Sequence, residues 1–252
     1  MKRQNENGSD AVRVEGLGLT LGGVAVLQEV SFAVQEGHFA CLCGPNGAGK
    51  TVLLKTILNL VRPTTGRVSL FGEPSTARSV RHRVGYVPQR KGFDRSFPAT
   101  VEDVLVANLR GEWPLRIARG EREKAAATLD LVGGSDLLDK PIANLSGGQL
   151  QRAFIARAMV TDPRLLLLDE PMAGVDARGN AEYMDLLGRL ADNAHLTAIL
   201  ITHSMEVVRR CAKQLVYLVN GKVVADGSPD VLMQDLRLSD LAFTGHDHEH
   251  SM

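Results

Sequence analysis

The run Gly44-Pro45-Asn46-Gly47-Ala48-Gly49-Lys50-Thr51 has the residue types and the spacing of a phosphate-binding loop. Its glycines let backbone N–H groups converge on phosphate oxygens, which larger side chains would keep away. Lys50 would reach the β- and γ-phosphates of a nucleotide, and the Thr51 hydroxyl would coordinate Mg²⁺. The alternative is a glycine-rich turn before an ordinary helix. The apolar strand pattern before the loop and the helical pattern after it favour a site for ATP and Mg²⁺.

Two acidic residues, Asp169 and Glu170, directly follow the apolar run at 165–168. That run is too short for a helix and fits a parallel strand buried on both faces. In an α/β sheet, the carboxyl end of such a strand lies beside the phosphate loop. Asp169 would hold Mg²⁺, directly or through water, and Glu170 would face the attacking water as general base. The alternative is a strand that simply ends in exposed acids, and the phosphate loop disfavours it.

A second anion-binding helix end is predicted at Leu145-Ser146-Gly147-Gly148-Gln149. Ser146 occupies an N-cap position, and the two glycines leave backbone N–H groups open to a ligand. The segment has no lysine comparable with Lys50. One chain therefore carries two half-sites for phosphate, far apart in sequence.

The elements that would position these residues alternate between strands and helices. Apolar spacing predicts strands at 12–14, 30–34, 39–43, 84–87, 165–168 and 198–201, helices at 49–60 and 178–192, and a hairpin at 215–219 and 222–226. Residues 100–160 are mainly helical in pattern and predict a helical subdomain. The alternation predicts an α/β fold with a mainly parallel sheet.

The composition of the 252-residue chain narrows the classes of function. Hydrophobic residues make up 44%, and Lys+Arg and Asp+Glu both number 29, so a core is expected and the net charge is zero. Zero net charge argues against a nucleic-acid partner. Cys41, Cys43 and Cys211 suggest no disulfide framework, which favours a reducing compartment. Cys41 and Cys43 lie two apart in an apolar run, so we expect them to be small buried residues on one face of a strand. The polar N-terminus has no signal region, and no apolar run reaches the roughly 18 residues of a membrane span, so a cytoplasmic protein is expected.

The order of these motifs strongly resembles the nucleotide-binding subunits of ATP-binding cassette (ABC) transporters, over about residues 12–235. The resemblance rests on the phosphate loop, on Leu-Ser-Gly-Gly-Gln before a helix, on Leu-Leu-Leu-Leu-Asp-Glu, and on Gln89, Asp176 and His203 in the family's order. It implies a P-loop NTPase with a RecA-like core at about 11–99 and 161–235, an antiparallel β subdomain and an inserted helical subdomain at about 100–160. Residues 1–10 and the histidine-rich 241–252 would be flexible tails.

The resemblance also implies a mechanism. Two subunits would form a head-to-tail homodimer, with each ATP between one chain's phosphate loop and the other chain's residues 146–149. Gln89 would sense Mg²⁺ and the water, His203 would contact the γ-phosphate, and Asp176 would reach across the dimer. Closure on ATP would drive integral membrane permease subunits from the cytoplasmic face of the membrane.

One position departs from the family's pattern. The family usually has an aromatic residue near the start that stacks on adenine, and aligning the Gly22-Gly23 turn places Leu21 there. Leucine offers apolar contact without the stacking, which is worth about 0.5–1.5 kcal/mol. We expect weaker binding of the adenine base, or a neighbouring residue that takes the same role.

The cargo is indicated only indirectly. Residues 90–101, which follow Gln89, contain two aromatic residues and a proline that would dock a helix of a membrane partner; packing within the loop is the alternative. This string, with Val175 before Asp176, is similar to the branch that imports zinc or manganese with an extracytoplasmic binding protein.

The terminal His246, His248 and His250 suit a divalent metal ion, or form a solvated tail without a role. A cassette for ferric chelates, cobalamin or another solute is the alternative. A soluble ABC protein acting on ribosomes or DNA is disfavoured, because the chain shows no second cassette, coiled-coil insertion or basic extension.

Overall fold

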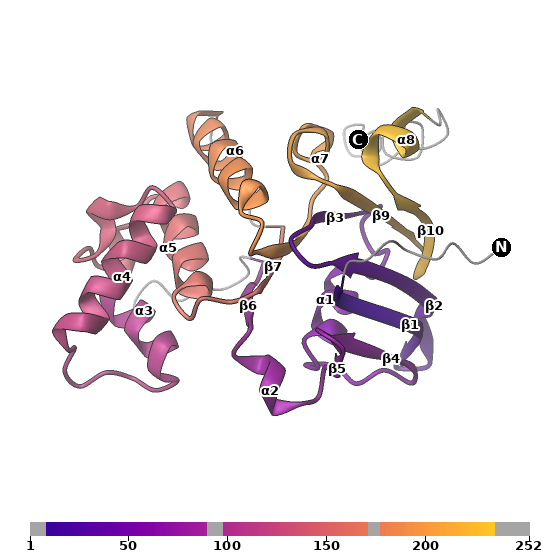
Figure 1. Ribbon diagram of the computed structural model, residues 1–252, viewed down its shortest axis with the longest axis horizontal. Coiled ribbons are helices and arrows are strands. Elements are labelled where there is room, and N and C mark those ends of the chain that lie inside the picture. Colours follow the sequence, from indigo (N-terminus) through magenta and orange to yellow (C-terminus); the bar gives the residue numbers. More distant parts are fainter. Residues whose placement is uncertain (1–8, 90–97, 171–176, 235–252) are drawn as a thin grey trace, which may run out of the picture. The chain divides into compact units, whose positions relative to one another are not determined.

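The computed structural model describes residues 9–89, 98–170 and 177–234 of the chain (Figure 1). The chain divides into two compact units: Met1–Arg81 with Ala191–Met252, and His82–Leu190. Each unit holds part of the predicted chemistry, because the phosphate loop belongs to the first and the Asp169-Glu170 pair to the second.

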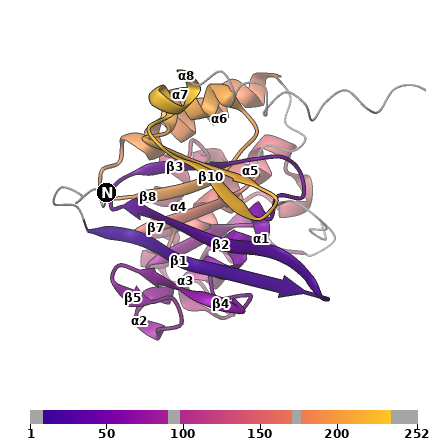
Figure 2. The same cartoon turned by 90° about the vertical axis from the view of Figure 1, so that its right-hand side faces the viewer.

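The first unit contains an antiparallel sheet built on one long hairpin (Figure 2). Strands β1 (Asp10–Leu21) and β2 (Val24–Gln35) pair around the Gly22-Gly23 turn, and β4 (Thr65–Leu70) and β5 (Glu73–Pro74) extend the sheet in the order β2-β1-β4-β5. Several register shifts interrupt the β1–β2 ladder. Such bulges break the two-residue alternation of a strand, so the sequence pattern predicts only the pieces at 12–14 and 30–34.

Parallel strands form the other layer of the first unit. Strand β3 (Phe39–Cys43) pairs in parallel with β8 (Thr197–Ile201) and with β9 (Gln214–Val219), and β9 pairs antiparallel with β10 (Lys222–Gly227). Every residue of β3 and β8 is buried, as unbroken apolar runs predict. Four helices complete the described part of this unit: α1 (Lys50–Ile57), α2 (Arg78–Arg81), α7 (Met205–Cys211) and α8 (Pro229–Gln234).

The second unit pairs two parallel strands with a group of helices (Figure 1). Strands β6 (Val84–Val87) and β7 (Leu165–Asp169) run side by side, with Gly85 opposite Leu166. The helices are α3 (Val101–Arg110), α4 (Arg119–Leu131), α5 (Gly147–Met159) and most of α6 (Ala177–Asp192), with 3-10 turns at Ser135–Leu137 and Ile142–Asn144. The unit is wider than the predicted helical subdomain at 100–160, because β6 packs on α5 and joins the helices.

Candidate functional site

The phosphate loop at residues 44–51 follows β3 and leads into α1, the strand–loop–helix order that the sequence predicts. Gly44 adopts a φ of 146°, and a Cβ at this position would lie 2.0 Å from the Leu218 carbonyl oxygen. Gly49 caps α1 with a φ of 101°. Both backbone conformations are rarely adopted by residues with a side chain, so the glycines are required by the course of the chain as well as by a ligand.

Lys50 is buried within its own loop, with 6% of its surface exposed. Its Nζ donates hydrogen bonds to the carbonyl oxygens of Gly44, at 2.8 Å, and of Pro45, at 3.0 Å. A buried ammonium needs such acceptors, because burying a charge without partners is costly. The ammonium is thus held over the loop where phosphate oxygens can replace the two carbonyls.

Thr51 lies in the first turn of α1, beside Lys50, and is half-buried. Its hydroxyl oxygen is a hard donor of the kind that Mg²⁺ prefers, and the helix N-terminus favours anionic phosphate nearby. No acidic residue occupies the first turn of α1. The residues of this half-site therefore suit an anionic ligand carrying a hard cation.

His203 lies at the same edge of the parallel strands as the phosphate loop. Leu42 on β3 pairs with Ile201 on β8, so Gly44 and His203 each stand two residues beyond this pair. His203 is exposed. Leu21, predicted to face the base, ends β1 at the tip of the long hairpin and is 45% exposed, next to a more exposed Val24 across the turn.

Gln89 and Glu170 meet in the second unit, although 81 residues separate them in sequence. The Gln89 side-chain Nε2 donates to Glu170 Oε2 at 2.8 Å. Glu170 has a φ of 42°, the left-handed region that non-glycine residues seldom adopt. Such backbone conformations concentrate at functional sites, and here it turns the carboxylate that follows β7 toward the residue that follows β6.

Asp169 ends β7 almost completely buried, with 1% of its surface exposed. The Tyr86 hydroxyl on the neighbouring strand β6 donates to Asp169 Oδ2 at 3.5 Å. Burial and the nearby carboxylate raise the pKa of Tyr86 to about 12, so its hydroxyl stays protonated at neutral pH. The sequence gives no signal for this contact, because it depends on the pairing of β6 with β7.

Ser146 caps α5 as the sequence predicts. Its Oγ accepts from the Gln149 backbone N–H at 3.3 Å, and Gln149 Oε1 accepts from the Ser146 N–H at 3.0 Å. This reciprocal pair is a capping box, which fixes the start of the helix. A Cβ on Gly148 would meet nothing within 4 Å, so space is open at this helix end.

The predicted residues thus divide between the two units. The phosphate loop, Leu21 and His203 belong to the first, whereas Gln89, residues 146–149, Asp169 and Glu170 belong to the second. Asp176, the docking segment after Gln89 and the histidine-rich tail lie outside the described residues, apart from residues 98–101 at the end of that segment.

The three cysteines are free and buried. Burial raises the pKa of the Cys43 thiol to about 12, so it stays protonated at neutral pH and is a poor metal ligand. Within the described part of the chain, no group of three or more His, Cys, Asp or Glu side chains could hold a metal ion.

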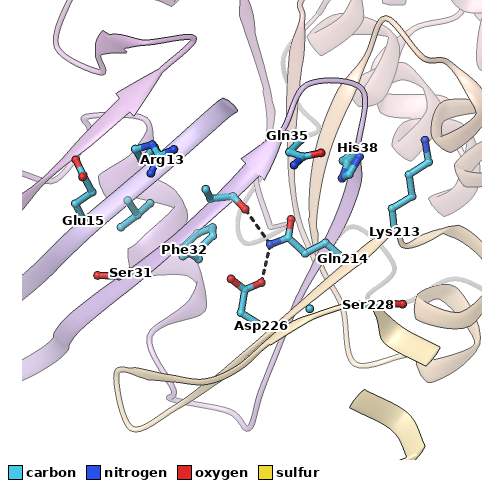
Figure 3. Close-up of a pocket in the computed structure, with 13 residues that line it drawn as sticks. Arg13, Glu15, Ser31, Phe32, Gln35, His38, Lys213, Gln214, Asp226 and Ser228 are labelled. Carbon is cyan, nitrogen blue, oxygen red and sulfur yellow. Dashed lines mark hydrogen bonds between the residues drawn. The ribbon is translucent and has the colours of Figure 1, made fainter. Parts of the chain in front are cut away.

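A groove of about 700 Å³ lies elsewhere in the first unit, between β2 and β10 (Figure 3). His38 and Lys213 line one end, and Gln214 Nε2 donates to the Ala33 carbonyl at 2.9 Å and to Asp226 Oδ1 at 2.6 Å. His38 precedes β3 and Lys213 precedes β9, so the groove lies at the amino ends of these parallel strands. Ligands of open α/β sheets bind at the carboxyl ends, where the phosphate loop is.

Among the described helices, none is long and apolar enough to cross a bilayer.

Comparisons with known proteins identify the family of the chain. Residues 27–173 match the family described as ABC transporter. The chain is 35% identical to the zinc import ATP-binding protein ZnuC of Pseudomonas fluorescens, over 95% of this chain and 88% of that protein. It is 39% identical to the zinc transport system ATP-binding protein TroB of Treponema pallidum, over 86% of this chain and 81% of that protein.

A solved structure extends the likeness to three dimensions. The ATP-binding cassette MJ0796, a dimer in a post-hydrolysis state bound to ADP and phosphate, is 25% identical with a TM-score of 0.74, over 86% of this chain and 98% of that one. The chain belongs to the ABC transporter family, and its α/β fold is that of an ATP-binding cassette. It is an ATPase subunit of that family.

Proposed function

We propose that this chain powers the import of a divalent metal ion, zinc or manganese, from the cytoplasmic face of the membrane. Its partners would be integral membrane permease subunits, and through them an extracytoplasmic metal-binding protein. The observation that carries the catalytic part is the meeting of Gln89 and Glu170 at 2.8 Å beside the buried Asp169. The cargo rests on relatives named for zinc at 35% and 39% identity.

ATP binding would begin at the phosphate loop. The Lys50 ammonium would exchange its two carbonyl acceptors for phosphate oxygens, a charge-assisted and therefore stronger interaction. The Thr51 hydroxyl, Asp169 and Gln89 supply oxygen atoms that suit Mg²⁺. When bound, Mg²⁺ would neutralise the charge that develops on the phosphates.

Hydrolysis would use Glu170 as general base. The Gln89 amide donates to Glu170 Oε2 in the structure, so this carboxylate oxygen is already engaged by a protein group. A shift of Gln89 toward the metal and the water would release Glu170 to accept a proton from the water. His203 would contact the γ-phosphate from the edge of β8.

A second copy of the chain would complete each site. The capped end of α5 at residues 146–149 has an anion-binding backbone but no lysine, so it suits the far side of a phosphate that Lys50 already holds. We propose a head-to-tail homodimer in which Asp176 also reaches across. The zero net charge gives no support for a nucleic-acid partner.

The variant Glu170→Gln tests the catalytic assignment. Without a base, the purified subunit should bind ATP, form a stable dimer and lose at least about 100-fold in kcat, the lower end of general-base contributions. Size-exclusion chromatography with Mg-ATP and a phosphate-release assay measure the two effects. Hydrolysis by the variant at the wild-type rate would show that another group is the base.

The cargo is tested separately in cells. Deletion of the gene should lower cellular zinc or manganese under metal limitation, measured together with iron by elemental analysis. Complementation with the wild-type gene should restore the metal, and complementation with the Lys50→Ala variant should not. A cobalamin or ferric-chelate phenotype without any change in zinc or manganese would reassign the cargo while leaving the ATPase intact.

A further inference from the structure

Gln151 is a buried polar residue on a face of α5 that is otherwise apolar. Gln151, Ile155 and Ala158 follow the i, i+4, i+7 spacing of one helix face and are 3%, 0% and 4% exposed. A glutamine at such a position is unusual, because a buried amide needs hydrogen-bond partners for both of its ends.

Helix α5 packs on strand β6, the parallel neighbour of β7. A Cβ on Gly85 of β6 would lie 2.4 Å from the Ala158 carbonyl oxygen, so helix and strand touch there. The chain leaves α5 and re-enters the sheet near the start of β6, where the Arg164 N–H donates to the Arg83 carbonyl at 2.8 Å. The helix therefore runs antiparallel to both strands.

Because α5 runs antiparallel to the strands, the position of Gln151 along them follows from the position of Ala158. Gln151 precedes Ala158 by seven residues, about 10 Å along the helix. Along a strand, 10 Å corresponds to about three residues. Starting at Gly85, this distance leads three residues toward the carboxyl end of β6. By this count Gln151 comes level with Pro88, the residue after β6, and with Asp169 at the end of β7. Gln89 and Glu170, which meet at 2.8 Å, are the next residues along the chain.

The Gln151 Nε2 atom is buried and has no hydrogen-bond partner among the described residues. The large majority of buried side-chain polar atoms have a hydrogen-bond partner, so a donor without one calls for an explanation. An apolar side chain of similar length would make this conformation more stable. The free-energy cost of this unpaired donor is explained if the Gln151 amide has an acceptor in another state of the molecule.

We propose that Gln151 is a positioning residue of the ATPase site. In the ATP-bound dimer its amide donates to an oxygen at the carboxyl ends of β6 and β7, where the Glu170 carboxylate is the strongest acceptor. The same helix presents residues 146–149 to the nucleotide of the partner subunit. Contact at the tip of α5 then sets the position of the base that hydrolyses ATP in its own chain. This inference rests on the proposed function.

The variant Gln151→Met separates this role from a structural one. It keeps the length of the side chain and removes the donor. We expect its melting temperature to rise by about 2–4 °C, since an unsatisfied buried group is lost. We expect its affinity for ATP to stay within twofold of wild type and its kcat for ATP hydrolysis to fall at least tenfold.

The matched control is Gln214→Met in the groove of Figure 3, away from the phosphate loop. Gln214 Nε2 has two acceptors in the structure, the Ala33 carbonyl and Asp226 Oδ1. The control should show the opposite pattern, with a lower melting temperature and an unchanged kcat. Calorimetry, ATP titration and phosphate release on both variants give the three readouts.

Three results would overturn the inference. A kcat for Gln151→Met equal to that of wild type would show that the amide has no part in catalysis, while wild-type hydrolysis would still support the proposed function. A lowered melting temperature would show that the amide is already bonded in the resting subunit. Failure of both Gln151→Met and Gln151→Leu to fold would also show that the amide is already hydrogen-bonded in the resting subunit.

Discussion

At the level of single residues, the polar groups of the half-sites are already engaged with protein atoms. Lys50 is held by two carbonyl oxygens of its own loop, and Glu170 by the Gln89 amide. In the proposed mechanism, a nucleotide, its metal or its water would replace each of these bonds. Ligand binding therefore exchanges hydrogen bonds, and the net gain is smaller than the strength of the new contacts suggests.

Leu21 is the residue whose replacement should improve nucleotide binding. It is 45% exposed at the tip of the β1–β2 hairpin, where the family usually has a stacking aromatic residue. The variant Leu21→Tyr should bind ATP about two- to tenfold more tightly, because stacking adds about 0.5–1.5 kcal/mol. Its affinity for inorganic triphosphate should not change. Fluorescence titration of both ligands against the Glu170→Gln background measures the difference without hydrolysis.

A matched control places the same change elsewhere in the first unit. Leu60 is 65% exposed beyond the end of α1, and Leu60→Tyr should leave both affinities unchanged. Equal tightening of ATP and triphosphate by Leu21→Tyr would mean that position 21 acts on the phosphates and not on the base.

At the level of elements, the sequence predicts best where one local rule decides the structure. The runs at 39–43 and 165–168 are unbroken and apolar, and both form fully buried strands. The Ser146 cap is confirmed because a capping box lies within four consecutive residues. The sequence misses β4, whose first three residues are exposed and include Gly66, since only pairing with β1 makes them a strand.

The contacts around the carboxylates could not be predicted in the same way. Motifs predict Gln89, Glu170 and Asp169 as site residues. The surroundings of Tyr86 and Gln151 depend instead on the pairing of β6 with β7 and on the packing of α5. The pattern of residues 84–87 predicts a strand, but it does not predict which strand pairs with it. The spacing of apolar residues in α5 predicts a buried face, but it does not predict which element packs on that face.

The contact between α5 and β6 depends on Gly85. A Cβ there would lie 2.4 Å from the Ala158 carbonyl oxygen and 3.1 Å from the Leu166 side chain. Gly85→Ala should therefore push the helix from the strand and cost about 1–3 kcal/mol of unfolding free energy, the usual cost of overpacking. Urea denaturation measures this cost. ATP hydrolysis should fall as well, because the carboxyl ends of β6 and β7 carry Gln89 and Glu170.

The control for this prediction is another glycine of the same unit. Gly120 lies in α4 with nothing within 4 Å of a Cβ, so Gly120→Ala should gain about 0.5–1 kcal/mol from helix propensity and leave ATP hydrolysis unchanged. Destabilisation by both variants to the same extent would argue against a specific α5–β6 contact.

At the level of the whole molecule, the two phosphate half-sites of one chain pose the question of which chain completes each site. In a head-to-tail dimer, the phosphate loop of one chain works with residues 146–149 of the other. In the alternative, each chain would close its own site. A mixed dimer distinguishes these arrangements. Two defects placed on different chains fall in the same nucleotide site in one arrangement and in different sites in the other.

The test pairs a Lys50→Ala chain with a Ser146→Arg chain, both carrying Glu170→Gln so that bound ATP is not hydrolysed. In the head-to-tail arrangement, one site receives both defects and the other receives none, so the mixed dimer should trap one ATP. Dimers of either variant alone should trap none, and the Glu170→Gln dimer should trap two. Differently tagged chains allow the mixed dimer to be purified and its nucleotide to be counted by chromatography.

Ser146→Arg also removes the cap of α5, at a cost of about 0.5–2 kcal/mol, so its folding is checked by thermal unfolding. If the mixed dimer traps no ATP while its chains are folded, each site is completed by its own chain, and the two half-sites do not belong to one interface.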